Sequence, residues 1–321
     1  MATKVCVTGG SGYIGSWLVR KLLVKGYTVH ATLRNLAEDR SKVDLLNSLP
    51  NADTNLVLFQ ADIYNAHEFD DAIQGCEFYK DRVEATVAGV RIIADCCIKS
   101  QTVKRLIYTA TVLASSPLNE DGSGYKSCMD ESCWTPSDHL PLTYANDYVL
   151  EYTKAKTLAE KELLIYNEME DAKLEVVTLL SGLVAGETIQ SHLPLSVQVI
   201  LSPFTGNMFG YYQGLKFMEE VLGSVPLVDI DDVCEAHIFC MENPSMKGRY
   251  LCAAADPTVR EIKAYLEENH PEFKIDEKEE AEIRGIKCDS SKLKEMGFEY
   301  KYDIRKIIDE SLECGKRLGA L

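Results

Sequence analysis

The sequence has no long apolar run, since none of its hydrophobic stretches approaches the ~20 residues that span a bilayer. We expect no secretory leader, because residues 1–4 pass directly into an apolar, β-branched stretch. It contains no internal repeat and no low-complexity segment. We therefore expect a globular chain without a membrane span or a signal peptide.

Basic residues are scarce, with 34 Lys and Arg against 50 Asp and Glu and a formal net charge of −16. Because nucleic acid backbones attract basic surfaces, this balance argues against nucleic acid as a partner. The 11 cysteines form no C-x-x-C pair, and the 6 histidines form no cluster at metal-ligand spacing, so we expect no metal site. Scattered thiols, such as Cys6 and Cys240 in apolar runs, are typical of a reduced, cytoplasmic protein.

The features that are present begin with a glycine-rich turn. Residues 4–8 form a short, strand-like apolar run that leads into spaced glycines, and apolar residues at helical spacing follow. Strand, glycine turn and helix open a dinucleotide-binding sheet, in which the backbone approaches a pyrophosphate at the positive end of the helix. The spacing fits G-x-G-x-x-G through Gly10, Gly12 and Gly15, or G-x-x-G-x-x-G with Gly9 in place of Gly10. An ordinary strand-to-helix turn is the alternative, but the position directly after a buried-type strand favours a cofactor.

The expected second strand, residues 29–34, ends in Arg34, and Lys42 follows shortly after. A dinucleotide fold that prefers NAD usually has an acidic residue at this point, on the ribose. A guanidinium can instead bind a 2′-phosphate through forked, charge-assisted hydrogen bonds. The sequence therefore predicts NADP(H) as the cofactor, with a solvated surface arginine as the alternative.

A tyrosine and a lysine four residues apart stand in the helix expected over residues 148–166. Tyr152 and Lys156 share one face of that helix. A carbonyl that accepts a hydride must also take up a proton, and a nearby ammonium makes a tyrosine a better acid at neutral pH. The same lysine can bind the nicotinamide ribose. Lys154 shows that lysines are frequent on this helix, so a solvated face is the alternative, but the upstream glycine turn favours the catalytic interpretation.

The T-G-G-S-G-Y-I-G-S stretch of residues 8–16, taken with the Y-x-x-x-K pair, resembles the extended short-chain dehydrogenase/reductase family. Nearly the whole chain is similar to plant reductases grouped around dihydroflavonol 4-reductase, anthocyanidin reductase, vestitone reductase and cinnamoyl-CoA reductase. Residues 223–225, 232–239 and 248–255 are most similar to anthocyanidin reductase. The resemblance implies an α/β fold with a Rossmann-type doubly wound parallel sheet and a smaller C-terminal substrate lobe.

In the family, an aspartate after the third strand hydrogen-bonds the adenine, and the resemblance gives this role to Asp62. The candidate cofactor-binding residues are Gly9, Gly12, Tyr13, Ile14, Gly15, Arg34, Lys42, Asp62, Tyr152 and Lys156, and the candidate catalytic residues are Thr111, Tyr152 and Lys156.

The sequence departs from the family near the expected catalytic residues. The family's serine, which hydrogen-bonds the substrate oxygen, aligns with Thr111, while Ser115 and Ser116 are fallback candidates. Ala155 replaces the serine of Y-x-x-S-K, and Ser181 replaces a proline. Because a threonine hydroxyl offers the same donor and acceptor as a serine, we expect Thr111 to take this role.

These features predict an NADPH-dependent reductase of a flavonoid-type phenolic substrate, similar to anthocyanidin reductase or dihydroflavonol reductase. The alternatives are a reductase of another phenylpropanoid or specialised-metabolite carbonyl, an epimerase, and a non-catalytic NADP-binding protein. The retained Tyr152 and Lys156 argue against the last of these, because a scaffold needs no proton donor.

At 321 residues and 46% hydrophobic, the chain can bury a large core. We expect an NADP-binding domain over residues 1–182 and a mainly substrate-binding lobe over residues 183–321, with some segments returning to the first domain. We expect a monomer or a homodimer that takes a small polyphenolic substrate. Residues 194–218 contain side chains that suit a flat aromatic molecule. They are Phe204, Met208, Phe209, Tyr211, Tyr212, Phe217 and Met218.

One strand of the family has no visible counterpart between residues 75 and 81. There the family has an apolar strand, a small-residue turn and a long loop, whereas this chain runs almost directly into an expected helix over residues 81–100. Four or five residues cannot supply a sheet-crossing strand and its return loop. We expect either a true deletion or about twenty further residues in the expressed polypeptide between Cys76 and Asp81. We favour the second, because a doubly wound sheet needs this strand for a continuous core.

Overall fold

The structure, a computed structural model, describes residues 3–62, 67–73, 78–81, 87–169, 173–205, 210–273 and 285–321. The chain divides into two compact units. Unit 1 lies within residues 1–110, 158–179 and 234–249, and unit 2 within residues 111–157, 180–233 and 250–321. The units therefore interleave along the chain. The division expected from the sequence, at residue 182 with some later segments returning to the first domain, stays a prediction. The expected binding of NADP by the first domain and of substrate by the second also stays a prediction.

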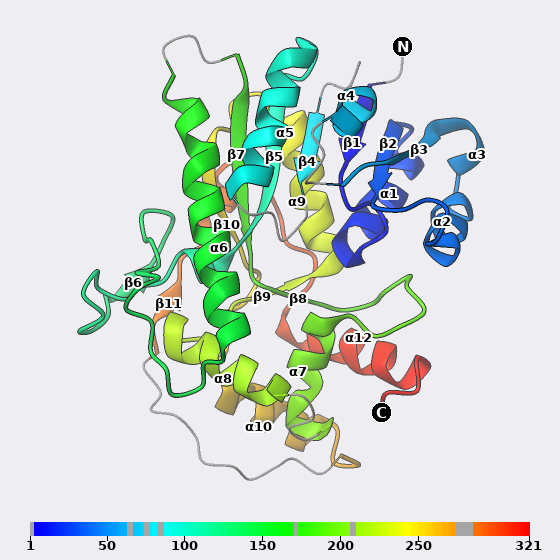
Figure 1. Ribbon diagram of the computed structural model, residues 1–321. Helices are drawn as coiled ribbons and strands as arrows, with labels where there is room; N and C mark the ends of the chain where they lie inside the picture. The colour runs from blue at the N-terminus through cyan, green and yellow to red at the C-terminus, as the bar shows by residue number, and fades with distance from the viewer. Residues whose placement is uncertain are drawn as a thin grey trace. The chain divides into compact units, whose positions relative to one another are not determined.

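The largest sheet has seven strands and the topology of a dinucleotide-binding fold (Figure 1). From one edge to the other, the strands are β10 (Gly248–Cys252), β7 (Glu175–Ser181), β5 (Arg105–Thr111), β4 (Phe78–Asp81), β1 (Lys4–Val7), β2 (Thr28–Leu33) and β3 (Leu56–Gln60). The neighbouring strands from β5 to β3 all pair in parallel. Numbered by appearance along the chain, the order is 7-6-5-4-1-2-3, which contains the 3-2-1-4-5-6 order of a Rossmann fold. The predicted α/β class is confirmed.

Helices connect these strands, as parallel pairing requires. In the first part of the chain they are α1 (Tyr13–Val24), α2 (Arg40–Asn47), α3 (Ala52–Asn55), α4 (His67–Ile73) and α5 (Val87–Ser100). Later in the chain, α6 (Asp147–Leu164), η2 (Ile165–Asn167) and α9 (Ile230–Glu242) lie wholly or partly in unit 1. Leu18 and Leu22, one turn apart on α1, are fully buried together with Val5 and Val7 of β1. Burial of this apolar stripe drives helix and sheet together.

The expectation of a missing strand is wrong. β4 lies between β1 and β5, with Phe78 in register with Val5 on one side and with Arg105 on the other. Four residues suffice because both of its edges are paired, and strands of this length are within the ordinary range. The reason for expecting about twenty additional residues therefore disappears. Residues 74–77 and 82–86, on either side of β4, lie outside the described residues.

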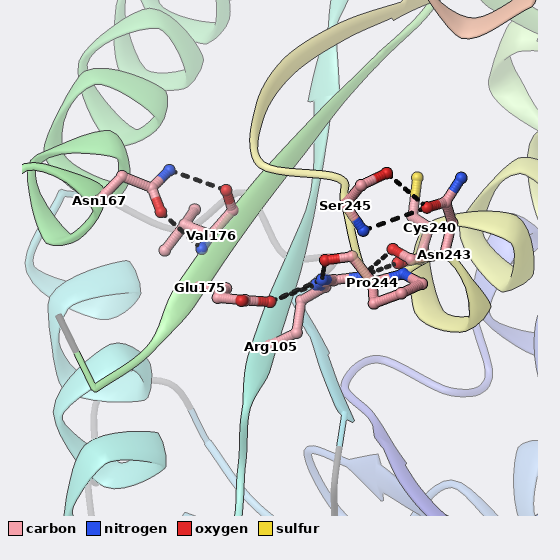
Figure 2. A network of polar contacts seen from close by, with 8 residues as sticks. All are labelled: Arg105, Asn167, Glu175, Val176, Cys240, Asn243, Pro244 and Ser245. Atoms are coloured by element: carbon pink, nitrogen blue, oxygen red, sulfur yellow. Dashed lines mark hydrogen bonds and ion pairs between the residues drawn. The ribbon is translucent and has the colours of Figure 1, made fainter. Parts of the chain in front are cut away.

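A buried arginine joins two strands of unit 1 to the end of a helix (Figure 2). Arg105, on β5, is only 3% exposed, and its Nη2 donates to Glu175 Oε2 on β7 at 2.6 Å. Its Nη1 donates to the carbonyl oxygens of Cys240 and Asn243, each at 2.6 Å. These carbonyls belong to the C-terminal end of α9, where helical carbonyls have no partner within the helix. A cation there also complements the helix dipole, so Arg105 fixes α9 to the sheet.

Unit 2 contains two short parallel pairs and several helices. The pairs are β6 (Cys128–Met129) with β11 (Lys287–Cys288), and β8 (Leu183–Ala185) with β9 (Leu227–Asp229). The helices of this part are η1 (Val112–Ala114), α7 (Leu195–Thr205), α8 (Tyr211–Leu222), α10 (Val259–Asn269), α11 (Ser291–Glu295) and α12 (Ile304–Arg317). None of the described helices combines the length and apolar character that a membrane span requires. Within the same residues, no three His, Cys, Asp or Glu side chains are grouped as metal ligands.

Asp229, at the end of β9, is a fully buried carboxyl group. Its Oδ1 accepts a hydrogen bond from the backbone of Asp231, whereas Oδ2 has no hydrogen-bond partner among the described residues. Burial raises the pKa of Asp229 to about 8, and the charges of Glu310 and Asp232 add to the increase. The folded protein therefore keeps this group protonated at pH 7, whereas the unfolded chain ionises it near pH 4.

Replacing Asp229 by asparagine is expected to stabilise the protein more at pH 8 than at pH 6. The folded-state pKa lies above the unfolded value, so the wild-type contribution is complete below pH 4 and is lost as the pH rises towards 8. The advantage of the variant should grow by about 2 kcal/mol between pH 6 and pH 8. Urea denaturation at the two pH values measures it. A difference between variant and wild type that is the same at both would contradict the assignment.

Candidate active site

The glycine turn between β1 and α1 has the geometry of a phosphate-binding turn. Gly9 has a φ of 58°, the left-handed region that glycine adopts most readily, and its carbonyl accepts a hydrogen bond from Gly12 N at 3.0 Å. A Cβ on Gly15 would collide with the carbonyl oxygen of Gly9, so this position accepts only glycine. Gly12 is the N-cap of α1 and has no side chain to cap it, and no acidic residue stands in the first turn. The first N–H groups of α1 are thus of the kind that bind anions.

The side chains of Arg34 and Asp62 lie close together after the adjacent strands β2 and β3. Arg34 Nε is 3.7 Å from Asp62 Oδ2, and the arginine side chain is 73% exposed. An exposed ion pair at this distance is weak, so the guanidinium can turn to another anion. Lys42 lies on α2 and pairs with Asp39 at 2.9 Å. Of the three residues predicted to bind the adenosine part of the cofactor, Arg34 and Asp62 therefore lie together. The third, Lys42, pairs with the residue at the N-cap of its own helix.

Thr111 ends β5, at the N-cap of the short helix η1. Its Oγ1 accepts a hydrogen bond from Leu113 N at 3.3 Å. Among the described residues, Oγ1 makes no other hydrogen bond. A hydroxyl that accepts one bond still has its own proton to donate. Thr111 therefore has the donor that the expected role on a substrate oxygen requires.

The two fallback serines use their protons inside unit 2. Ser115 Oγ donates to the carbonyl oxygen of Asp130 at 2.9 Å, and Ser116 Oγ donates to that of Val221 at 2.6 Å. Both serines are fully buried. Because each hydroxyl has only one proton, neither serine is as well placed as Thr111 to donate to a substrate.

Helix α6 separates its two neighbouring lysines into different environments. Lys156 is 6% exposed and lies one turn after the half-buried Tyr152. Lys154 is exposed and pairs with Asp138 at 2.7 Å. Lysine is almost never buried without a partner, so burial marks Lys156 as the one with a specific task. The alternative that these lysines lie on a solvated helix face therefore holds for Lys154 but not for Lys156.

Comparison with known proteins supports the same family. The family model described as GDP-mannose 4,6 dehydratase matches residues 6–80. A putative anthocyanidin reductase of Ginkgo biloba is 36% identical, covering 99% of this chain and 96% of the relative. A noscapine synthase of Papaver somniferum is 34% identical, covering 99% and 93%. Among solved structures, vestitone reductase from alfalfa is 33% identical, with a TM-score of 0.81 and 99% of both chains covered.

The chain belongs to the extended short-chain dehydrogenase/reductase family, in the group that includes anthocyanidin reductase and vestitone reductase. In this reductase, the glycine turn, Arg34 and Asp62 fall in unit 1, while Thr111, Tyr152 and Lys156 fall in unit 2. The roles of these residues stay predictions, and the geometry above is what supports them.

Two residues on the helix that carries Tyr152 and Lys156 have interactions that were not predicted from the sequence. Tyr148 stacks on Tyr152, with ring centroids 6.3 Å apart and an angle of 19° between the rings. Glu160, one turn after Lys156, is fully buried and accepts hydrogen bonds from Thr178 and Arg249. The i, i+4 spacing on a predicted helix was the available signal for Tyr148, whereas nothing local indicates the partners of Glu160.

The aromatic and methionine side chains of residues 204–218 differ in burial. Phe217 is fully buried, and Tyr212 and Met218 are nearly so. Phe204 and Tyr211 are half-buried, and the Phe204 ring lies 4.9 Å from that of Phe273. Phe217 is therefore part of the core of unit 2. Met208 and Phe209 lie outside the described residues.

Proposed function

We propose that this protein is an NADPH-dependent reductase of a flavonoid-type phenolic substrate, with Tyr152 as the proton donor. The observation that carries the proposal is the buried Lys156 one turn after the half-buried Tyr152 on α6. A nearby ammonium is what a tyrosine needs in order to act as an acid at neutral pH. The relatives named for anthocyanidin and vestitone supply the substrate class.

The residues of the glycine turn fit a dinucleotide. The close packing of Gly15 on Gly9 and the absence of a capping side chain at Gly12 support a pyrophosphate site at the start of α1. Gly9, Gly12, Tyr13, Ile14 and Gly15 would hold this part, Arg34 and Lys42 the 2′-phosphate, and Asp62 the adenine. When bound, NADPH supplies the hydride.

The chain's own residues handle the proton and the developing charge. Tyr152 donates its O–H proton to the substrate oxygen as negative charge develops there. Lys156 stabilises the phenolate that remains and binds the nicotinamide ribose. Thr111 donates a hydrogen bond to the same substrate oxygen, which lowers the energy of the charged transition state.

The test is a turnover panel in which NADPH consumption is followed by absorbance. Purified protein is offered a dihydroflavonol, an anthocyanidin, an isoflavanone, a cinnamoyl-CoA ester and short aliphatic ketones. We expect reduction of at least one flavonoid, at a carbonyl or at an oxidised C-ring. Reduction of only the ester or the aliphatic ketones would overturn the substrate class. Binding of NADPH without consumption of it on any compound would overturn the reductase itself.

A second candidate is a reductase of another specialised-metabolite carbonyl. The observation that favours it is the relative named for noscapine, which is nearly as similar as the anthocyanidin reductase. The same assay with non-flavonoid aromatic ketones separates the two candidates.

We also propose that the protein is cytoplasmic and is a monomer or a homodimer. The cysteines in the described part of the chain are not in disulfides, which supports a reducing compartment. Fractionation of cells and light scattering of the purified protein measure the two properties.

Replacing Arg34 by alanine is expected to weaken NADPH binding by about tenfold or more and to leave NADH binding nearly unchanged. A charge-assisted contact to a phosphate contributes roughly 1.5–3 kcal/mol, and NADH lacks that phosphate. Titration of both cofactors against wild type and variant measures the effect. Equal loss for the two cofactors would show that Arg34 has no role in reading the 2′-phosphate.

Replacing Thr111 by valine is expected to lower kcat by about 10²-fold or more, because it removes one donor to the developing oxyanion. Valine keeps the β-branched shape, so the end of β5 should stay in place. The matched control is Ser116→Ala, which should lower stability and leave kcat nearly unchanged, because Ser116 donates to Val221 O. A normal rate in the Thr111 variant would transfer the role to another hydroxyl.

A further inference from the structure

Glu68, in the first turn of α4, hydrogen-bonds the backbone of a predicted cofactor-binding residue. Its Oε2 accepts from Asp62 N at 2.7 Å. Asp62 stands two residues after the end of β3, and both residues belong to unit 1. A hydrogen bond from a backbone N–H to an ionised carboxylate is stronger than one between neutral groups. Glu68 therefore fixes the backbone at the point where the chain leaves β3.

Helix α4 is held in unit 1 by contacts other than that of Glu68. Phe69, Ala72 and Ile73 are buried, and the helix packs against β2 and β3. On β2, His30 Nδ1 donates to the carbonyl oxygen of Ala72 at 2.8 Å. Burial of these apolar side chains stabilises the helix in its place. Removing the Glu68 carboxylate should therefore leave α4 in position and change the backbone of Asp62 alone.

The side chain of Asp62 is suited to meet a ligand at the surface of unit 1. It is 34% exposed, and its Oδ2 lies 3.7 Å from Arg34 Nε. An ionised carboxylate has about four acceptor positions on its two oxygens, so it can pair with an arginine and accept from a ligand at the same time. The adenine base has one donor group, its 6-amino group. A carboxylate that hydrogen-bonds adenine therefore accepts from that amino group.

We propose that Glu68 is a positioning residue for the adenine end of the cofactor, because it holds the backbone of Asp62 where the Asp62 carboxylate can accept from the 6-amino group. Glu68 accepts from the backbone of Asp62, so it acts through position and leaves the carboxylate to the ligand. The inference rests on the proposed function in that the protein binds NADPH with Asp62 on the adenine. Adenine is common to NADPH and NADH, whereas the 2′-phosphate assigned to Arg34 is present in NADPH alone. The two residues should therefore affect the two cofactors differently.

The test is fluorescence titration of NADPH and NADH against wild type, Glu68→Ala and Glu68→Gln. For Glu68→Ala, we expect Kd to rise about fivefold to tenfold for both cofactors, the equivalent of one weakened hydrogen bond. Glu68→Gln keeps a side-chain oxygen that accepts, so its Kd values should stay within about twofold of wild type. A change confined to NADPH in either variant would overturn the proposal, because it would show that Glu68 acts on the 2′-phosphate through its charge.

A cofactor analogue isolates the 6-amino group. NADPH with unsubstituted purine in place of adenine lacks this donor and gains no other. In a double-mutant cycle, Glu68→Ala should raise the Kd of the analogue by less than about twofold, because the contact that it weakens is already absent. An equal rise for the analogue and for NADPH would overturn the positioning role, since a structural effect of Glu68 would not depend on the amino group.

A second carboxylate of α4 supplies the matched control. Asp71 is exposed on the same helix, and Asp71→Ala removes the same charge without removing the bond to Asp62. It should leave both Kd values unchanged, and a rise equal to that of Glu68→Ala would overturn the proposal. Thermal unfolding shows whether each variant folds. If Glu68→Ala does not fold, Glu68→Asp carries the same expectation, because it keeps the charge on a shorter side chain.

Turnover separates failure of this inference from failure of the proposed function. At saturating NADPH, kcat of Glu68→Ala should stay within about twofold of wild type while KM for NADPH rises, because Tyr152, Lys156 and Thr111 are unchanged. The expected Kd pattern in a protein that reduces no tested compound would support the positioning role and overturn the reductase. A working reductase in which Glu68→Ala binds both cofactors as wild type does would overturn the positioning role alone.

Discussion

Replacing Tyr152 by phenylalanine is expected to lower kcat by about 10²- to 10⁴-fold, the usual contribution of a positioned general acid. The substitution removes the phenolic O–H and keeps the ring, so its stacking on Tyr148 should persist. NADPH should still bind, because the glycine turn, Arg34 and Asp62 are unchanged. We expect this loss of kcat together with an unchanged dissociation constant for NADPH. Fluorescence titration measures the dissociation constant.

The two lysines of α6 provide the matched controls. Lys156→Ala should weaken both turnover and cofactor binding, because the proposed lysine stabilises the phenolate and binds the ribose. Lys154→Ala removes an exposed ion pair with Asp138 and should change neither. A Tyr152→Phe enzyme with more than about a tenth of wild-type kcat would exclude Tyr152 as the main proton donor.

Replacing Glu160 by alanine is expected to lower the free energy of unfolding by about 3–5 kcal/mol, because it leaves a buried cation without its carboxylate. Glu160 Oε1 accepts from Arg249 Nε on β10 at 2.9 Å and from Thr178 Oγ1 on β7 at 2.6 Å. The glutamate is fully buried, and the arginine side chain is 8% exposed. The C-terminal half of α6 is therefore fixed to two strands of unit 1 through one carboxylate. Urea denaturation of wild type and variant measures the loss.

An exposed ion pair on the same helix is the control. Glu162 pairs with Arg91 of α5 at 2.7 Å, where the arginine is mostly exposed, so Glu162→Ala should cost less than about 1 kcal/mol. Removing both buried charges, with Glu160→Leu and Arg249→Met, should cost less than Glu160→Ala alone. Equal losses for Glu160→Ala and Glu162→Ala would show that burial of the Glu160 pair contributes nothing.

The local features of the site follow from sequence spacing. Gly9, Gly12 and Gly15 indicate a phosphate-binding turn because they stand between an expected strand and an expected helix. In a dinucleotide-binding fold, glycines at this spacing connect the first strand to the first helix. Tyr152 and Lys156 share a face because any α-helix brings residues four apart together. The order of strands and helices along the chain likewise predicts a parallel sheet, which the structure confirms.

The strand β4 was not predicted from the sequence. Its four residues looked too few for a sheet-crossing strand, because length was judged from this segment alone. In the fold, the segment has β1 on one side and β5 on the other, so its backbone groups can be paired on both edges. The partners lie far away in sequence, and no pattern within residues 78–81 specifies them.

By itself, the sequence determined the strand–glycine turn–helix unit, the shared helix face of Tyr152 and Lys156, and the α/β class. Each depends on spacing within one element or on the order of elements. Only the tertiary structure decided that Lys156 is buried while Lys154 is exposed, and that Thr111 keeps a proton that Ser115 and Ser116 have given to backbone carbonyls. It alone brought Glu160 to Arg249, 89 residues later in the chain. Burial and long-range hydrogen bonds depend on how distant segments pack, and the residue types at those positions are compatible with either environment.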